Sequence, residues 1–322
     1  MIEMRDTVVI RKALKDTRNT TKETREIKPS GVKLTKPPAP RPRLFNASPQ
    51  KRPEIVGIDR EYQTAEYMDD VYNYLLKQEK QLVIPEGGVN KLTIKPKMRS
   101  ILVDWLVQVH GRFHLFPETL HLTVYLVDSC LAKMKVEKTE LQLVGMACML
   151  VACKFEEMYV PDIKDFEYIA DNAFSKQQIM KMEIKVLGAT DYMLSRPHSI
   201  TFIRWIAKEA ETAPRVQYLA KYFSEMALLE ETVSHFLPSQ IAFLSLYLAH
   251  VVGKKKLSTS RLAKLIDWTE DGVTEALPIF VKAILRFHEQ ERLAAVRNKY
   301  SSNKFHAVAN ISDEDLNIVK RL

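Results

Sequence analysis

Two segments of the chain, residues 98–109 and 141–158, carry apolar side chains around almost the whole circumference of a helix. Helices of this kind are normally surrounded by other helices, so we expect both at the centre of a helical domain. Gly145, in the second segment, allows a neighbouring helix to approach closely. In the first segment one apolar stripe repeats every three or four positions: Met98, Ile101, Leu102 and Trp105. The same segment keeps three polar residues that we expect to be fixed for a reason: Arg99, Asp104 and Gln108.

Helical periodicity covers most of the remaining chain and predicts an all-α protein. An amphipathic helix is expected between residues 61 and 80, followed by two sets of five helices. Trp105 and Trp205 occupy corresponding helices, which argues for a duplicated five-helix unit. Ser175 is the expected N-cap of one of these helices. The expected helices are 98–113, 118–133, 139–157, 162–171 and 175–190 in the first set, and 198–211, 215–229, 238–251, 258–267 and 270–288 in the second.

The N-terminal segment differs from the rest in composition. Residues 1–57 contain seven prolines and a single aromatic residue, Phe45, too little apolar surface to offset the entropy of ordering, so we expect disorder. Residues 1–54 carry 14 Lys and Arg against 6 Asp and Glu, which equals the net charge of +8 of the whole chain. The expected folded part is therefore neutral, which argues against nucleic acid as a partner.

The chain shows no sign of a secreted or membrane protein. No signal peptide is apparent, and the longest apolar run, residues 241–253, is too short to cross a bilayer. The three cysteines, at positions 130, 148 and 153, lie in apolar helical runs and are expected as core residues in a reducing compartment. We expect a soluble intracellular protein without membrane contact.

The sequence contains no recognisable catalytic centre. It has no glycine-rich phosphate loop, no His-Glu-x-x-His pattern and no nucleophile with an evident base partner. Its eight histidines are scattered, and Glu156 and Glu157 point about 100° apart on a helix, a poor arrangement for an acid–base pair. We therefore expect a binding module with no cofactor and no metal.

Two strings carry a resemblance to a known family: MRSILVDWLVQV at residues 98–109 and LQLVGMACMLVACKFEEMYVPDI from residue 141. They resemble the cyclin box, and most closely that of the mitotic, B-type cyclins. The resemblance implies a regulatory subunit that binds and activates a mitotic cyclin-dependent protein kinase. It also implies two tandem five-helix boxes: a disordered basic tail over 1–57, a short helix and linker over 58–97, the first box over 98–195, the second over 196–290 and an extension over 291–322.

The resemblance assigns a kinase-binding role to residues of the first box and the N-terminal helix. In cyclins, the residues that match Lys154 and Glu183 contact the mobile regulatory helix of the kinase and the segment that leads into it. The alternative is an ordinary surface ion pair beside core aromatics. Apolar residues that match the same interface are Tyr67, Val71, Phe155, Leu187, Tyr192 and Leu194.

The apolar stripe of residues 98–105 matches a docking groove of cyclins, partly exposed, that receives short Arg-x-Leu segments of kinase substrates. A carboxylate beside the groove would attract the arginine, but the matching residue here is Gln108, so we expect modest or altered affinity. The alternative is that Met98, Ile101, Leu102 and Trp105 simply belong to the core.

Two further pairs match family positions. Arg99 and Asp128 correspond to an ion pair between helices, which we assign to structure. Arg204 and Lys221 correspond to a basic pocket of B-type cyclins that reads phosphorylated segments. The third position of that pocket, usually His, is Gln217, so ordinary solvated helix charges are an equally good reading.

The tail carries candidate regulatory motifs. Arg11, Leu14 and Asn19 fit the pattern Arg-x-x-Leu-x-x-x-x-Asn, the destruction box of mitotic cyclins. The motif predicts recognition by the anaphase-promoting complex and ubiquitin-dependent loss at mitotic exit. Ser48 precedes a proline and has a lysine at +3, which fits a site for the kinases that cyclins activate.

Three other functions remain open. A two-box transcription factor would require a basic folded surface and an N-terminal zinc ribbon, a transcriptional cyclin would usually lack the destruction box, and a helical scaffold would act without a kinase. For a B-type cyclin we expect a place in the nucleus and cytoplasm and a role in cell division, in mitosis or meiosis.

Overall fold

The structure, a computed structural model, describes residues 67–89, 94–254 and 259–322. All regular elements in these ranges are helices, so the prediction of an all-α protein is confirmed. The predicted disordered tail, with its destruction box and Ser48, lies outside the described residues. The α-helices are α3 (Met68–Glu79), α4 (Pro96–Phe113), α5 (Pro117–Lys133), α6 (Leu141–Glu156), α7 (Ile163–Ile169), α8 (Lys176–Ala189), α9 (Ser199–Glu209), α10 (Pro214–Ala227), α11 (Pro238–Val252), α12 (Thr259–Leu265), α13 (Glu270–His288), α14 (Ala295–Tyr300) and α15 (Asp313–Val319). Short 3-10 helices are η2 (Lys138–Glu140), η3 (Glu231–Val233) and η4 (Asn303–Phe305).

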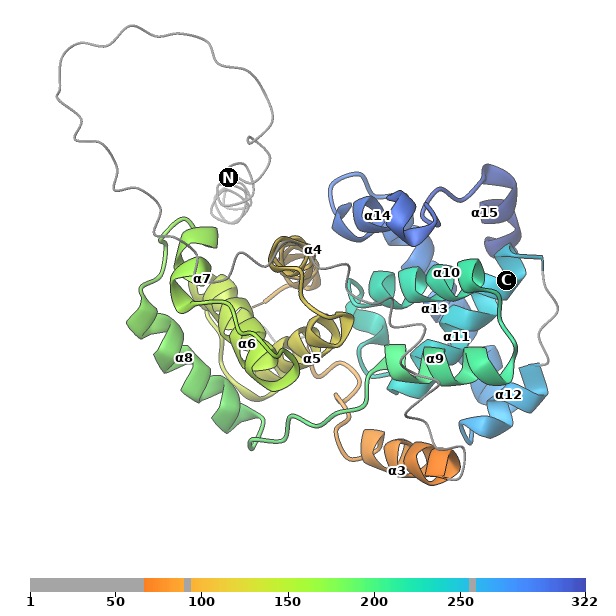
Figure 1. The fold of residues 1–322 in the computed structure, drawn as a ribbon, viewed down its shortest axis with the longest axis horizontal. Coiled ribbons are helices and arrows are strands. Elements are labelled where there is room, and N and C mark those ends of the chain that lie inside the picture. Colours follow the sequence, from red (N-terminus) through yellow and green to blue (C-terminus); the bar gives the residue numbers. More distant parts are fainter. Residues whose placement is uncertain (1–66, 90–93, 255–258) are drawn as a thin grey trace, which may run out of the picture.

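Helices α4–α8 and α9–α13 form two neighbouring bundles, each with its own apolar core, as the sequence predicted (Figure 1). In the first bundle α6 is buried along its whole length from Leu141 to Cys153. A Cβ atom on Gly145 would lie 2.8 Å from a methyl group of Leu102, so this glycine permits the close approach of α4 and α6. The corresponding central helix of the second bundle is α11, which packs on α9 and α10.

Local sequence signals explain where many helices begin. Proline occupies the first turn of α4, α5, α10 and α11, where its missing N–H would have no helical partner. Ser175 caps α8: its hydroxyl accepts a hydrogen bond from Gln178 N at 3.4 Å, and Gln178 Oε1 accepts one from Ser175 N at 2.8 Å. This is the capping box expected for a helix start.

The two bundles are joined at a buried arginine of α4. The guanidinium of Arg99 donates from Nε to Asp128 Oδ1 at 2.6 Å and from Nη2 to Asp128 Oδ2 at 2.7 Å. Its Nη1 donates to the carbonyl of Leu228 in the second bundle at 2.9 Å, and Ser100 Oγ donates to the carbonyl of Leu229 at 2.8 Å. The side chain is 1% exposed, so this network fixes α4 against both α5 and the end of α10.

Helix α3 attaches to the second bundle, below α9 in Figure 1. The ring of Tyr72 stacks on that of Trp205, with centroids 4.0 Å apart. The buried carboxylate of Glu79 accepts hydrogen bonds from Ser239 N at 2.9 Å and from Ser239 Oγ at 2.6 Å, in the first turn of α11. Burial raises the pKa of Glu79, while the two Ser239 donors oppose this shift.

The C-terminal helices, which periodicity did not predict, fold back on both bundles. Helix α14 packs against α4, where Asp104 Oδ1 accepts a hydrogen bond from Ala295 N at 2.9 Å. The buried carboxylate of Glu225 binds Lys299 Nζ at 2.7 Å and Tyr300 Oη at 2.7 Å. Helix α15 lies against α11.

None of the described helices has the length and hydrophobicity that a membrane span requires. The three cysteines are free and buried, and burial raises the pKa of Cys153 to about 12, so its thiol stays protonated at neutral pH. Within the described ranges no group of His, Cys, Asp or Glu residues is arranged to hold a metal ion.

Replacing Asp128 with alanine is expected to lower the free energy of unfolding by about 3–5 kcal/mol, because it leaves the buried charge of Arg99 without its carboxylate. Urea unfolding followed by circular dichroism measures the loss. Lys133→Ala on the same helix is the control, since the Lys133–Asp191 ion pair is exposed and should contribute no more than about 1 kcal/mol. Equal losses in the two variants would contradict the role assigned to Arg99.

Replacing Glu79 with alanine is expected to release α3 from the second bundle. Loss of the two hydrogen bonds to Ser239 should weaken the attachment by about 2 kcal/mol, equivalent to roughly 30-fold faster amide exchange in α3. Hydrogen exchange read by mass spectrometry measures this change. In the control, Lys80→Ala, only an exposed ion pair with Asp267 is lost, and exchange in α3 should stay near the wild-type rate.

Candidate functional site

Lys154 and Glu183, which the resemblance assigns to kinase binding, lie in contact. Lys154 Nζ, in the last turn of α6, is 2.5 Å from Glu183 Oε1 on α8. The lysine side chain is 49% exposed and that of Glu183 13%. An ammonium group has three donors, and this contact occupies one of them, so Lys154 keeps donors for carbonyl groups of a partner.

Apolar side chains stand exposed around this pair. Phe155 follows Lys154 at the end of α6 and is half exposed, and Tyr192, just beyond α8, is mostly exposed. Leu187 and Leu194 are only partly exposed and pack against the first core. The side chain of Tyr192 is presented by two successive residues with left-handed backbone, Asp191 and Tyr192, at φ 51° and 60°.

The exposed apolar surface is larger than the sequence analysis indicated. Met158 and Tyr159, in the turn after α6, are 83% and 87% exposed, and Ile184, next to Glu183 on α8, is also exposed. The sequence did offer one signal, an apolar run of Met, Tyr and Val directly after a charged helix end. We define the α6–α8 surface by Lys154, Phe155, Met158, Tyr159, Glu183, Ile184 and Tyr192.

Polar contacts hold the end of α6 rigidly under this surface. Glu157 Oε1 accepts hydrogen bonds from Phe116 N and from Thr119 Oγ1, the latter at 2.6 Å, at the start of α5. Glu156 Oε1 lies 3.1 Å from His198 Nε2 in the segment that leads into α9. Glu157 thus connects the end of α6 to the start of α5, and Glu156 connects it to the segment before α9. The end of α6 is therefore anchored to both bundles.

The N-terminal helix adds a second exposed apolar face. Tyr67, Val71 and Tyr74 on α3 are each more than half exposed, while Tyr72 on the opposite face packs on Trp205. Gln78 Nε2 donates to Ser195 Oγ at 3.0 Å, which connects α3 to the segment directly after Leu194. This face therefore has a fixed position relative to the α6–α8 surface.

The predicted docking stripe is less exposed than expected. Leu102 and Trp105 are each 1% exposed, because both pack within the first core, so the prediction of partial exposure is wrong for these two residues. Met98 and Ile101 are partly exposed. The indole N–H of Trp105 is buried without a hydrogen-bond acceptor in the described structure. Gln108 Nε2 donates to Asp104 Oδ2 at 3.0 Å.

The two cations of the predicted phosphate pocket have other contacts. Arg204 Nη1 is 2.6 Å from Glu118 Oε1 of α5, and Lys221 Nζ lies 5.0 Å from the centre of the Tyr218 ring. Gln217, in place of the usual histidine, donates to the carbonyl of Thr212 at 2.8 Å. A phosphate at Arg204 would have to compete with Glu118, which weakens this prediction.

Comparison with known proteins identifies the fold. The N-terminal domain of cyclins matches residues 70–195 and the C-terminal domain of cyclins matches residues 197–314. The structure is similar to a viral cyclin from herpesvirus saimiri, with a TM-score of 0.60 and 17% identity over 67% of this chain and 96% of the viral protein. A chain of the yeast RNA Pol II CTD kinase CTDK-1 complex is similar with a TM-score of 0.57 and 15% identity, over 77% of this chain and 80% of the yeast chain.

Sequence relatives indicate which group of cyclins the chain belongs to. G2/mitotic-specific cyclin-B1 of Caenorhabditis elegans is 36% identical over 83% of this chain and 78% of its own length. G2/mitotic-specific cyclin-B of Hydra viridissima is 41% identical over 77% of this chain, which spans 63% of the Hydra protein. The chain belongs to the cyclin family, in the G2/mitotic-specific B group, as predicted. Members of this family are regulatory proteins of the cell cycle and are not themselves enzymes.

Proposed function

We propose that this chain is the regulatory subunit of a mitotic cyclin-dependent protein kinase, which it binds and activates through the α6–α8 surface and the exposed face of α3. The observation that carries the proposal is the exposed apolar surface around the Lys154–Glu183 pair. Contiguous exposed apolar residues beside a few directional polar groups are typical of protein-binding surfaces.

The geometry suits the task of holding a mobile kinase element in its active position. A regulatory subunit shifts such an equilibrium only by binding one conformation more tightly than the others. A rigid surface does this best, and the anchoring of α6 by Glu156 and Glu157 supplies rigidity. Lys154 then offers N–H donors to carbonyls of the kinase, and Glu183 offers acceptors to its free amides.

The alternative functions are less well supported. A two-box transcription factor needs a basic folded surface, whereas residues 55–322 carry 34 Lys and Arg and 34 Asp and Glu. A transcriptional cyclin would share the fold, so the likeness to a chain of the yeast CTD kinase complex does not separate the two. Relatives from Hydra viridissima, Caenorhabditis elegans and Gallus gallus, each called a G2/mitotic-specific cyclin, favour the mitotic role.

The same proposal includes substrate docking at α4. A short Arg-x-Leu segment would approach the partly exposed Met98 and Ile101, and the indole N–H of Trp105 is a donor without an acceptor. Use of this donor requires a small shift of the side chains over Trp105. With Gln108 in place of a carboxylate, the groove should hold the leucine better than the arginine.

Kinase activation depends, in this proposal, on Lys154 and Glu183. The double variant Lys154→Ala with Glu183→Ala should remain folded, because the pair lies at the surface, with Lys154 half exposed, and the variant removes both charges together. Phosphorylation of histone by a mitotic cyclin-dependent kinase, measured with a fixed amount of kinase subunit, should fall at least about tenfold through lost binding.

The matched control for this experiment is Lys254→Ala with Glu314→Ala. These residues form an exposed ion pair at 3.4 Å between the end of α11 and α15, away from the α6–α8 surface. Its kinase activity should equal that of the unchanged protein. Full histone-kinase activity in the Lys154 and Glu183 variant would refute the proposed binding mode.

We also propose that the protein is present in nucleus and cytoplasm during mitotic or meiotic division and is destroyed at mitotic exit. The support is the destruction-box pattern of Arg11, Leu14 and Asn19, which the anaphase-promoting complex would recognise. Ser48, and a phosphopeptide site at Arg204 and Lys221, remain further candidates for regulation by phosphate groups.

Timed destruction can be tested in cycling cell extract. A variant with Arg11→Ala and Leu14→Ala should persist through mitotic exit, with a half-life several times that of the unchanged chain, because both anchoring side chains of the motif are lost. Immunoblotting against time measures the protein. Arg18→Ala with Thr17→Ala, inside the same segment but off the defining positions, is the control and should disappear on schedule. Normal disappearance of the Arg11 and Leu14 variant would show that another signal directs destruction.

A further inference from the structure

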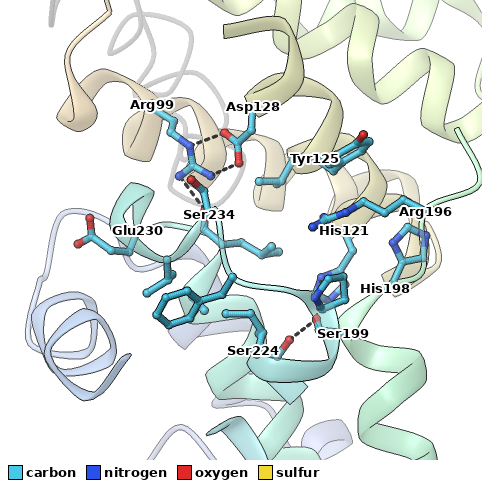
Figure 2. A pocket seen from close by; sticks show the side chains of 17 residues that line it. Arg99, His121, Tyr125, Asp128, Arg196, His198, Ser199, Ser224, Glu230 and Ser234 are labelled. Carbon is cyan, nitrogen blue, oxygen red and sulfur yellow. Dashed lines mark hydrogen bonds and ion pairs between the residues drawn. The ribbon is translucent and has the colours of Figure 1, made fainter. Parts of the chain in front are cut away.

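A cavity of about 60 Å³ lies between the two bundles, close to the Arg99–Asp128 pair (Figure 2). Its walls come from α5 on the first bundle and, on the second, from the segment that leads into α9, the end of α10 and the region around η3. The volume is enough for roughly four water molecules, or for one tetrahedral oxyanion of similar size.

The guanidinium of Arg196 lies in the cavity wall, and one of its N–H groups is unsatisfied. In Figure 2 it extends under the ring of Tyr125, and its Cζ atom is 4.5 Å from the ring centre. Its Nε is buried, and in the described part of the chain no hydrogen bond or ion pair engages this atom. A buried guanidinium with unmade hydrogen bonds is unfavourable, so an acceptor from outside the chain would stabilise it.

The carboxylates around the cavity already have partners. Asp128 is bound twice by Arg99, and Glu230 Oε2 is 2.8 Å from Arg286 Nη1. In Figure 2 the Glu230 side chain points away from the cavity. Glu156 binds His198, and the more distant Glu79 binds Ser239. Among the described residues, none of these carboxylates forms an ion pair with Arg196.

Neutral donors face the same space. Ser199 Oγ lies 2.8 Å from Ser224 Oγ and 3.3 Å from His121 Nδ1. Burial lowers the pKa of His121 well below its usual value, so its ring is neutral at physiological pH. Ser199 is also the first residue of α9, and the N-cap residue, His198, makes no side-chain cap. The N-terminal end of α9, with its partial positive charge, therefore borders the cavity without a side-chain cap.

We infer that the cavity between the bundles is a binding site for a small inorganic oxyanion of the phosphate or sulfate class. Arg196 supplies charge and N–H donors, and the hydrogen-bonded pair of Ser199 and Ser224 keeps one hydroxyl donor for the ion. A bound ion contacts groups of both bundles and stabilises their arrangement.

The test compares the full chain in sodium phosphate, sodium sulfate and sodium chloride at equal ionic strength. Isothermal calorimetry and thermal unfolding should give saturable binding and a rising Tm with phosphate or sulfate, and neither with chloride. Arg196→Gln should weaken the affinity at least about tenfold, because it removes the charge and most donors. Arg215→Gln, at an exposed arginine of α10, is the matched control and should bind as the unchanged protein does.

Two more variants keep the result decisive. Lys221→Gln tests whether the anion binds in this cavity or in the candidate phosphate pocket on the second bundle. If it binds in the cavity, this variant should leave anion binding unchanged. The double variant Ser199→Ala with Ser224→Ala retains the guanidinium and should also weaken binding. It serves as the test if the Arg196 variant does not fold. The inference is overturned by non-saturable binding, by equal responses to phosphate and chloride, or by loss of binding in the Lys221 variant alone.

Discussion

The bidentate contact of Arg99 with Asp128 is the interaction on which the arrangement of the two bundles depends. Apolar burial drives each bundle to form, but it is non-directional and does not specify how two bundles meet. A buried guanidinium has five donors in a fixed plane, and Arg99 distributes them between α5 and the carbonyl of Leu228. Because an unpaired charge at this depth is strongly unfavourable, arrangements of the bundles that break these bonds are disfavoured.

Buried carboxylates position the N-terminal and C-terminal segments, just as the buried guanidinium of Arg99 positions the two bundles. Glu79 joins α3 to the start of α11, Asp104 receives the start of α14, and Glu225 binds Lys299 and Tyr300. Each acid is buried and each accepts hydrogen bonds from a segment far away in the sequence. The apolar contacts beside these acids stabilise the attached segments, and the acids fix where the segments lie. A displacement of about 1 Å breaks a hydrogen bond, whereas apolar contacts tolerate it. The positions of α3 and α14 are thus set by a few buried hydrogen bonds.

Much of the fold could be read from the sequence, since helical periodicity and proline positions are local signals. The place of α6, the cap at Ser175 and the duplicated five-helix order all follow from residues near one another in the chain. Contacts between distant residues have no such signal: Glu79 and Ser239 are 160 positions apart, and nothing in the sequence marks Arg196 as lacking a partner. Periodicity also shows that a face is apolar without showing what covers it. For this reason the sequence wrongly predicts partial exposure of Leu102 and Trp105, and it does not predict the exposure of Met158 and Tyr159.

Two ion pairs of the first bundle, Arg99–Asp128 and Lys154–Glu183, differ in burial and therefore in the role that each can play. Arg99 and Asp128 are nearly inaccessible, so neither can exchange its partner without loss of the fold. Lys154 and Glu183 meet at the edge of an exposed apolar surface, where water replaces a broken contact at a free-energy change of only about 0–1 kcal/mol. A partner that covers the surrounding aromatic residues also removes water from this pair, which strengthens any hydrogen bond that Lys154 then makes to it. In the proposed complex, the weakness of the pair in the free protein would allow both residues to form directional contacts with the partner.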